Sequence, residues 1–158
     1  MRRQFSQLAE YKLVIAGAWG WRAEPIKKVS QEAKYKDDIL FLGYVSPKDK
    51  TALCNLASLF VYPSFYEGFG FPPLEAAACG VPVVTSSVSS LPEVVGSSAL
   101  LINPFKPQEI AQAMAQILLN PSLADKLRLA GLKQAQKFSW PEAARQYLKL
   151  FAQVGEGG

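Results

Sequence analysis

The sequence predicts a doubly wound α/β fold: a parallel sheet of about five strands, helices on both of its faces and a helical C-terminal end. Two observations predict it. Short apolar segments alternate with longer amphipathic ones, which is the pattern of consecutive βαβ units. The short segments are rich in β-branched and aromatic residues and are followed by turn residues, as buried parallel strands are.

The elements follow in order along the chain. Strands are expected at residues 12–16, 39–42, 59–62, 81–85 and 100–102. Helices are expected between and after them, at residues 23–35, 47–57, 73–79, 91–95, 107–119, 122–137 and 141–154. With no internal repeat and no low-complexity linker, residues 1–154 are expected to form a single domain. The glycine-rich residues 155–158 are expected to be a disordered tail.

Composition and charge limit the possible partners. Hydrophobic residues make up 49% of the chain and charged residues 19%, which is typical of a globular protein in water. No apolar run approaches the roughly 18 residues of a membrane span, and no signal peptide is apparent. The expected location is therefore the cytoplasm, at most peripheral to the inner face of a membrane. The net charge of +4 permits an anionic ligand. Nucleic-acid binding is not expected, because the sequence has no basic stripe with interleaved aromatic residues.

The chain contains no histidine, the commonest general base and a frequent metal ligand. Asp37 and Asp38 form the one acidic pair in the sequence, with no ligand-like spacing around them. Cys54 and Cys79 are isolated thiols in apolar surroundings, where core positions are more common than metal ligation. Neither a metal-dependent mechanism nor a cofactor is therefore expected.

The loop after the third strand carries the most informative chemistry. Gly68 and Gly70 flank Phe69 at the point where the strand gives way to a helix expected to open at Pro73. Glycine allows positive φ and close approach of the backbone to a ligand, and a helix N-terminus favours phosphate. Because prolines lack an N–H group, the expected donors nearby are the amides of Gly70, Phe71 and Leu74.

Two acidic residues, Glu67 and Glu75, lie eight positions apart around this turn. If both face one ligand, Glu75 accepts hydrogen bonds from a ribose diol and Glu67 contacts a sugar or developing positive charge. In the alternative interpretation, Glu67 is a solvated loop residue and Glu75 complements the helix dipole. For an arbitrary Gly-x-Gly before a helix the second interpretation is the commoner one.

The amino-acid sequence of the loop and of the segments around it favours the first interpretation. Residues 66–96 read YEGFGFPPLEAAACGVPVVTSSVSSLPEVVG, preceded by FLGYVSPKDKTALCNLASLFVYPS and followed by ALLINPFKPQEIAQAM and FSWPEAARQYL. This order resembles the family 4 glycosyltransferases of GT-B fold, also described as glycosyl transferases group 1. Glu67 and Glu75 match the family's Glu-x7-Glu element, and the resemblance covers roughly residues 12 to 151.

The resemblance implies a Rossmann-like C-terminal domain that binds a nucleoside-diphosphate sugar and serves a retaining, metal-independent hexosyltransferase acting on a glycan or lipid acceptor. It places Glu67 in the catalytic position beside the donor sugar and Glu75 on the ribose. The other donor-binding positions that it implies are Gly68, Phe69 and Gly70 beside the sugar hydroxyls, Phe71 and Leu74 near the pyrophosphate, and Tyr44 and Val45 beside the base.

The family also has parts that the resemblance does not reach. In the family, an Arg and a Lys of an earlier loop neutralise the pyrophosphate, and an N-terminal domain binds the acceptor and contributes a histidine. We therefore expect this chain to lack the domain's first strand and the whole N-terminal domain, and to be inactive alone. The alternative is a non-catalytic binding or assembly module, or a remnant, that pairs with a separate N-terminal half.

A run of serines precedes the helix expected at residues 91–95. Ser86, Ser87, Ser89 and Ser90 either cap this helix or contact a ligand, and capping is the favoured interpretation because serine is a common N-cap residue.

Overall fold

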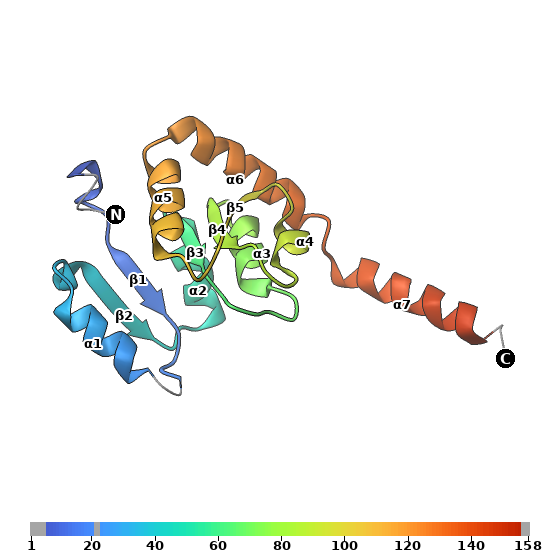
Figure 1. Cartoon of the computed structure of the whole chain (residues 1–158). Coiled ribbons are helices and arrows are strands. Elements are labelled where there is room, and N and C mark those ends of the chain that lie inside the picture. Colours follow the sequence, from blue (N-terminus) through green and yellow to red (C-terminus); the bar gives the residue numbers. More distant parts are fainter. Residues whose placement is uncertain (1–5, 21–22, 156–158) are drawn as a thin grey trace. The chain divides into compact units, whose positions relative to one another are not determined.

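The computed structural model describes residues 6–20 and 23–155 and divides into two compact units, Met1–Ala57 and Ser58–Gly158 (Figure 1). In chain order, the first unit contains the 3-10 helix η1 (Ser6–Leu8), strand β1 (Leu13–Ala16), helix α1 (Glu24–Glu32), the 3-10 helix η2 (Lys36–Asp38), strand β2 (Ile39–Gly43) and helix α2 (Pro47–Leu56).

In the first unit β1 and β2 pair in parallel, with Leu13 opposite Ile39 and an irregularity in register after Ile15. α1 contacts η2, and none of its residues is buried. Beside β2, the rings of Trp19 and Phe41 lie 4.8 Å apart, and Nζ of Lys27 lies 4.8 Å from the Trp19 ring centre. The aromatic rings of Trp19 and Phe41 and the long side chain of Lys27 thus lie at this side of β2, and α1 has no buried apolar stripe.

The second unit contains β3 (Phe60–Tyr62), α3 (Phe71–Ala78), β4 (Val83–Ser86), α4 (Leu91–Val95), β5 (Ala99–Ile102), α5 (Pro107–Leu118), α6 (Pro121–Ala135) and α7 (Trp140–Gly155). Its three strands pair in parallel in the order β3-β4-β5 (Figure 1). Parallel neighbours require a crossover between them, and α3 and α4 lie in these crossovers.

The central strand β4 organises the core of the second unit. All four of its residues are buried, and because side chains alternate between faces, both faces of this strand are covered. Val84 belongs to a buried cluster with Ile102, Ala113, Ile117 and Leu127, which come from β5, α5 and α6. Gly131 of α6 lets that helix approach α3 closely, since a Cβ there would lie 3.3 Å from Cβ of Ala77.

The predicted fold class is confirmed: among the described residues, five strands, all in parallel pairs, alternate with helices, and three helices follow the last strand. The hydrogen bonds join the strands as a pair and a triplet, where one sheet was expected. β4 begins at Val83 instead of 81, because the Val81 amide donates to Ala76 at the end of α3 and Pro82 has no amide hydrogen. Of the predicted tail, Gly155 is the last residue of α7, and residues 156–158 lie outside the described residues.

Over the described residues, no helix combines the length and the apolar character that crossing a bilayer requires.

We expect backbone amides of β4 to exchange their hydrogens more slowly than those of β1 and β2. β4 is buried on both faces, whereas most residues of β1 are exposed and buried positions are absent from β2. Strand pairs without a buried face open at low free-energy cost. Native-state hydrogen exchange followed by mass spectrometry measures the difference. Equal or slower exchange in β1 and β2 would contradict this ranking of local stability.

Candidate functional site

The candidate site lies in the second unit, where β3 and β4 end side by side. Tyr62 is opposite Thr85 in the register of the two strands, and the Thr85 hydroxyl donates to the Tyr62 carbonyl at 2.9 Å. The loop of residues 63–70 follows β3, and the loop of residues 87–90 follows β4. Because parallel strands end at the same edge of a sheet, these two loops are neighbours at the edge where α/β folds bind their ligands.

The entry into α3 turns on Gly70, which has φ 105° and ψ 47° and is the N-cap of the helix. The first helical residue is Phe71, so the prediction that Pro73 opens the helix was wrong by two positions. Pro72 and Pro73 occupy the next two places in the first turn, where their fixed φ suits the helix and their missing N–H groups cost little. Gly70 and Phe71 retain amide hydrogens at this helix start, whereas the two prolines contribute none.

Two serines of the second loop bind the first loop. The backbone N–H of Glu67 donates to Oγ of Ser89 at 3.0 Å. Oγ of Ser90 lies 2.7 Å from the carbonyl oxygen of Phe69 and 3.1 Å from that of Glu67, so its single proton is shared between two acceptors. Ser89 holds an unusual φ of 51° in this position. The favoured prediction that this serine run caps a helix was wrong: Ser90 is the N-cap of α4, but its side chain makes no capping hydrogen bond.

The carboxylate of Glu67 is held by the last residue of β3 and by a residue of its own loop. The Tyr62 hydroxyl donates to Oε1 at 2.6 Å, and the Ser64 hydroxyl donates to the same oxygen at 2.8 Å. Burial, together with the hydrogen bond to Glu67 and the charge of that residue, raises the pKa of Tyr62 to about 12. Tyr62 therefore remains protonated, and remains a donor, throughout the neutral range.

The predicted site residues fall into two groups. The residues from Glu67 to Glu75 are contiguous over the loop and the first turns of α3; Glu67 is half-buried, Glu75 is exposed and the Leu74 side chain is buried. Tyr44 and Val45 belong to the first unit, directly after β2, where Tyr44 is exposed and Val45 half-buried. Their role beside a base stays a prediction.

Aromatic rings line the helix start. The rings of Phe69 and Phe71 lie 4.6 Å apart, Phe69 meets the edge of Phe138 at 5.7 Å, and Phe71 stacks on Trp140 at 6.2 Å. The backbone of the loop is thus supported by ring contacts as well as by the serine hydrogen bonds. Over the residues that the structure describes, no three His, Cys, Asp or Glu side chains come close enough to hold a metal ion.

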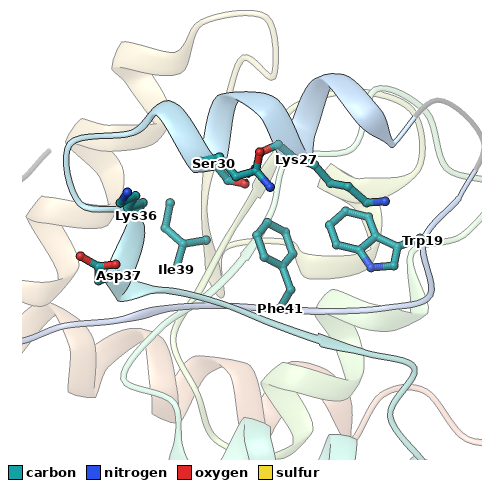
Figure 2. Close-up of a pocket in the computed structure, with 8 residues that line it drawn as sticks. Trp19, Lys27, Ser30, Lys36, Asp37, Ile39 and Phe41 are labelled. Carbon is teal, nitrogen blue, oxygen red and sulfur yellow. Dashed lines mark hydrogen bonds between the residues drawn. The ribbon is translucent and has the colours of Figure 1, made fainter.

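The first unit has a separate hollow of about 460 Å³ between α1 and β2, lined by Trp19, Lys27, Ser30, Gln31, Lys36, Asp37, Ile39 and Phe41 (Figure 2). Ile39 and Phe41 project from β2 toward the helix, and Trp19 lies beside Phe41. The hollow follows the face of the strand from Asp37, just before β2, to Phe41. It is the space left beneath a helix with no buried residues, and no predicted site residue lines it.

Sequence reasoning missed the four residues that hold Glu67: Tyr62, Ser64, Ser89 and Ser90. A signal for the last two was present, since a serine run after β4 must lie near the loop after β3 if the two strands pair. The signal for Tyr62 and Ser64 was weaker, because a short loop of unknown conformation does not reveal which side chains turn back on a carboxylate.

The fold is of the class that binds ligands beyond the carboxyl ends of parallel strands. Within this class, the chain belongs to the family of glycosyl transferases group 1, whose model matches residues 2–134. The resemblance seen in the loop sequence is thereby confirmed over most of the chain, including the whole loop from Glu67 to Glu75.

The names of similar proteins agree with this assignment. The chain is 40% identical over 141 residues to the O-antigen chain mannosyltransferase B of Escherichia coli, a match that covers 89% of this chain and 37% of that protein. It is 36% identical over 115 residues to a D-inositol 3-phosphate glycosyltransferase of Nocardioides, covering 72% of this chain and 25% of the relative. The chain thus spans well under half the length of these relatives.

Solved structures match in fold. The sucrose-phosphate synthase of Thermosynechococcus elongatus superposes with a TM-score of 0.84 and 28% identity, over 99% of this chain and 41% of that protein. Anabaena Alr3699/HepE, solved in complex with UDP, superposes with a TM-score of 0.80 over 90% of this chain and 41% of its own. At 20% identity, this second likeness concerns the fold alone.

We expect Gly70→Ala to lower the free energy of unfolding by about 1–3 kcal/mol, the usual cost of a residue held in a disfavoured backbone conformation. The φ at this position disfavours any side chain, and the new Cβ would lie 2.6 Å from Cδ2 of the buried Leu91. The matched control is Gly68→Ala, where the Cβ meets no atom within 4 Å and we expect a change within about 0.5 kcal/mol. Urea denaturation measures both variants, and equal losses would contradict the special role of Gly70.

Proposed function

We propose that this chain is the donor-binding part of a retaining, metal-independent glycosyltransferase that moves a hexose from a nucleoside-diphosphate sugar to a glycan or lipid acceptor. The observation that carries the proposal is the arrangement of the loop after β3. Two carboxylates, Glu67 and Glu75, flank a glycine turn that leads into a helix start at the carboxyl edge of the sheet.

The proposed roles follow from the chemistry of each position. The exposed Glu75, in the second turn of α3, accepts hydrogen bonds from the ribose hydroxyls of the nucleotide. Glu67, half-buried in the loop, faces the donor sugar, where a carboxylate stabilises positive charge developing at the anomeric carbon. The backbone of Gly68, Phe69 and Gly70 contacts the sugar hydroxyls.

The diphosphate lies near Phe71 and Leu74 in this proposal, at the positive end of the α3 dipole. Pro72 and Pro73 withhold two amide donors from it. We therefore propose that an arginine and a lysine of an earlier loop of this domain, as in the family, complete the diphosphate site, and that a separate N-terminal domain binds the acceptor. Tyr44 and Val45 flank the base, and the chain works in the cytoplasm or at the inner face of a membrane.

The family relatives guide the choice of donor. Relatives of E. coli named as mannosyltransferases, at 40% and 38% identity, make a mannose donor the first to test. The HepE complexes with UDP and with UDP-glucose give reason to include uridine nucleotides. A thermal-shift screen of the chain with GDP-mannose, UDP-glucose, ADP-glucose and the free nucleotides therefore tests the proposal directly. Stabilisation by none of them would contradict it and favour a non-catalytic assembly module or a remnant.

We expect Glu75→Ala to weaken binding of both the nucleotide sugar and the free nucleotide by about one to two powers of ten. Charge-assisted hydrogen bonds to the ribose are worth about 1.5–3 kcal/mol, and the ribose is common to both ligands. Isothermal titration calorimetry measures the change. Glu32→Gln, an exposed glutamate at the end of α1, is the control for the loss of one negative charge. Unchanged affinity in Glu75→Ala would refute the ribose role.

We expect Glu67→Gln, in contrast, to weaken binding of the nucleotide sugar by about tenfold and to leave the affinity for the free nucleotide unchanged, because this side chain faces the sugar. The ratio of the two dissociation constants, measured by the same calorimetry, isolates the effect. An equal loss for both ligands would place Glu67 on the nucleotide and contradict its role beside the sugar.

A further inference from the structure

We propose that Tyr62 and Ser64 are positioning residues that hold the Glu67 carboxylate through one oxygen, Oε1, and so direct the other oxygen, Oε2, toward a hydroxyl of the donor sugar. This inference rests on the proposed function for the role of Glu67 itself. It adds two residues that the loop motif does not identify, and it says which carboxylate oxygen the sugar meets.

The first step is the geometry of the two hydroxyl donors. Tyr62 comes from the end of β3 and Ser64 from the start of the loop, yet both donate to Oε1, at 2.6 and 2.8 Å. A carboxylate oxygen has two lone-pair sites in its plane. Two donors on Oε1 occupy both sites, so a sugar hydroxyl that binds this carboxylate must use Oε2.

The second step is the fixing of the Glu67 backbone. Its N–H donates to Ser89, and its carbonyl oxygen accepts from Ser90, both in the loop after β4. The backbone is therefore held on both sides by one loop, while the end of the side chain is held by two hydroxyls. A glutamate in water samples many rotamers, and this arrangement selects one before a ligand arrives.

The third step is the strength and persistence of the Tyr62 hydrogen bond. The hydrogen bond from the Tyr62 hydroxyl to the Glu67 carboxylate is 2.6 Å long, which is typical of a short, charge-assisted hydrogen bond. Since the pKa of Tyr62 is raised to about 12 from 10.0, the hydroxyl keeps its proton at every pH below the ordinary tyrosine range. Tyr62 thus donates continuously under conditions in which a nucleotide sugar is stable.

Ser64 contributes in a different way. Its hydroxyl lies 2.8 Å from Oε1 of Glu67 and 3.1 Å from the carbonyl oxygen of Tyr66, so its single proton is shared between the carboxylate, at the shorter distance, and the backbone of the loop. Tyr62, by contrast, connects the carboxylate to the sheet, because it is the last residue of β3 and its own carbonyl oxygen accepts a hydrogen bond from the buried Thr85. Together they connect the carboxylate to both structures that define the edge of the site.

A double-mutant cycle on the full chain tests the proposal, with GDP-mannose against GDP and UDP-glucose against UDP as probe pairs in calorimetry. Tyr62→Phe and Ser64→Ala are each expected to weaken binding of the nucleotide sugar about three- to tenfold and to change the affinity for the free nucleotide less than twofold. In the Glu67→Gln background the same two substitutions are expected to have no further effect, since their action passes through the carboxylate. Tyr147→Phe and Ser122→Ala, which alter exposed side chains outside the two loops of the candidate site, are the matched controls.

A second measurement reads the interaction without ligand. With ¹³C-labelled tyrosine, the pKa of Tyr62 measured by NMR is expected to fall below about 12 in Glu67→Gln. Burial, the largest of the three causes that raise this pKa, remains in the variant, but the hydrogen bond to the carboxylate and its charge are both changed. An unchanged pKa of Tyr62 in this variant would overturn the proposal whatever the binding data, because the hydrogen bond between Tyr62 and Glu67 would then be absent in solution.

The binding outcomes separate the inference from the proposed function. If Glu67→Gln weakens the sugar nucleotide but Tyr62→Phe and Ser64→Ala do not, the positioning role is overturned and the proposed function stands. The positioning role is also overturned if Tyr62→Phe or Ser64→Ala weakens binding of the nucleotide sugar as much in the Glu67→Gln background as it does alone. The two hydroxyls would then act independently of the carboxylate. If Glu67→Gln has no effect, or the chain binds no nucleotide sugar, the proposed function fails and the positioning role fails with it.

Discussion

The candidate site depends on the parallel pairing of β3 with β4. This pairing places Tyr62 opposite Thr85, brings the loops after the two strands together, and allows Ser89 and Ser90 to bind the backbone of Glu67 and Phe69. Neither loop contains secondary structure that would fix it alone. Hydrogen bonds between them, together with the buried β4 beneath, convert two short connections into one surface with a defined shape.

The sequence allowed the elements to be predicted because local pattern determines them: β-branched segments gave the strands, and prolines marked the helix starts. Predictions failed where a backbone contact outside the pattern decided the result. Phe71 begins α3 because Gly70 adopts a left-handed conformation, which hydrophobic periodicity does not reveal. Val81 lies outside β4 because its amide is taken by the end of α3. The pairing of strands into two groups likewise depends on contacts distant in sequence.

The candidate site was predictable to the extent that it is contiguous. Glu67, the two glycines and Glu75 lie within nine residues, so a motif contains them all. The groups that hold Glu67 were not predictable, because Ser89 lies 22 positions away and acts through its hydroxyl on a backbone amide. Serine before a helix is usually a cap, and that general preference concealed the contact. A site motif names the groups that meet a ligand more readily than the groups that hold them.

The double proline at the start of α3 has a consequence for how the loop exists before any ligand binds. Each ring fixes one backbone torsion and removes one amide that water would otherwise have to solvate. The unfolded chain is also stiffer at this point, so less conformational freedom is lost when the turn forms. The entrance to the helix is therefore a rigid corner, and the loop that it anchors is set in place by folding and does not depend on a ligand for its conformation.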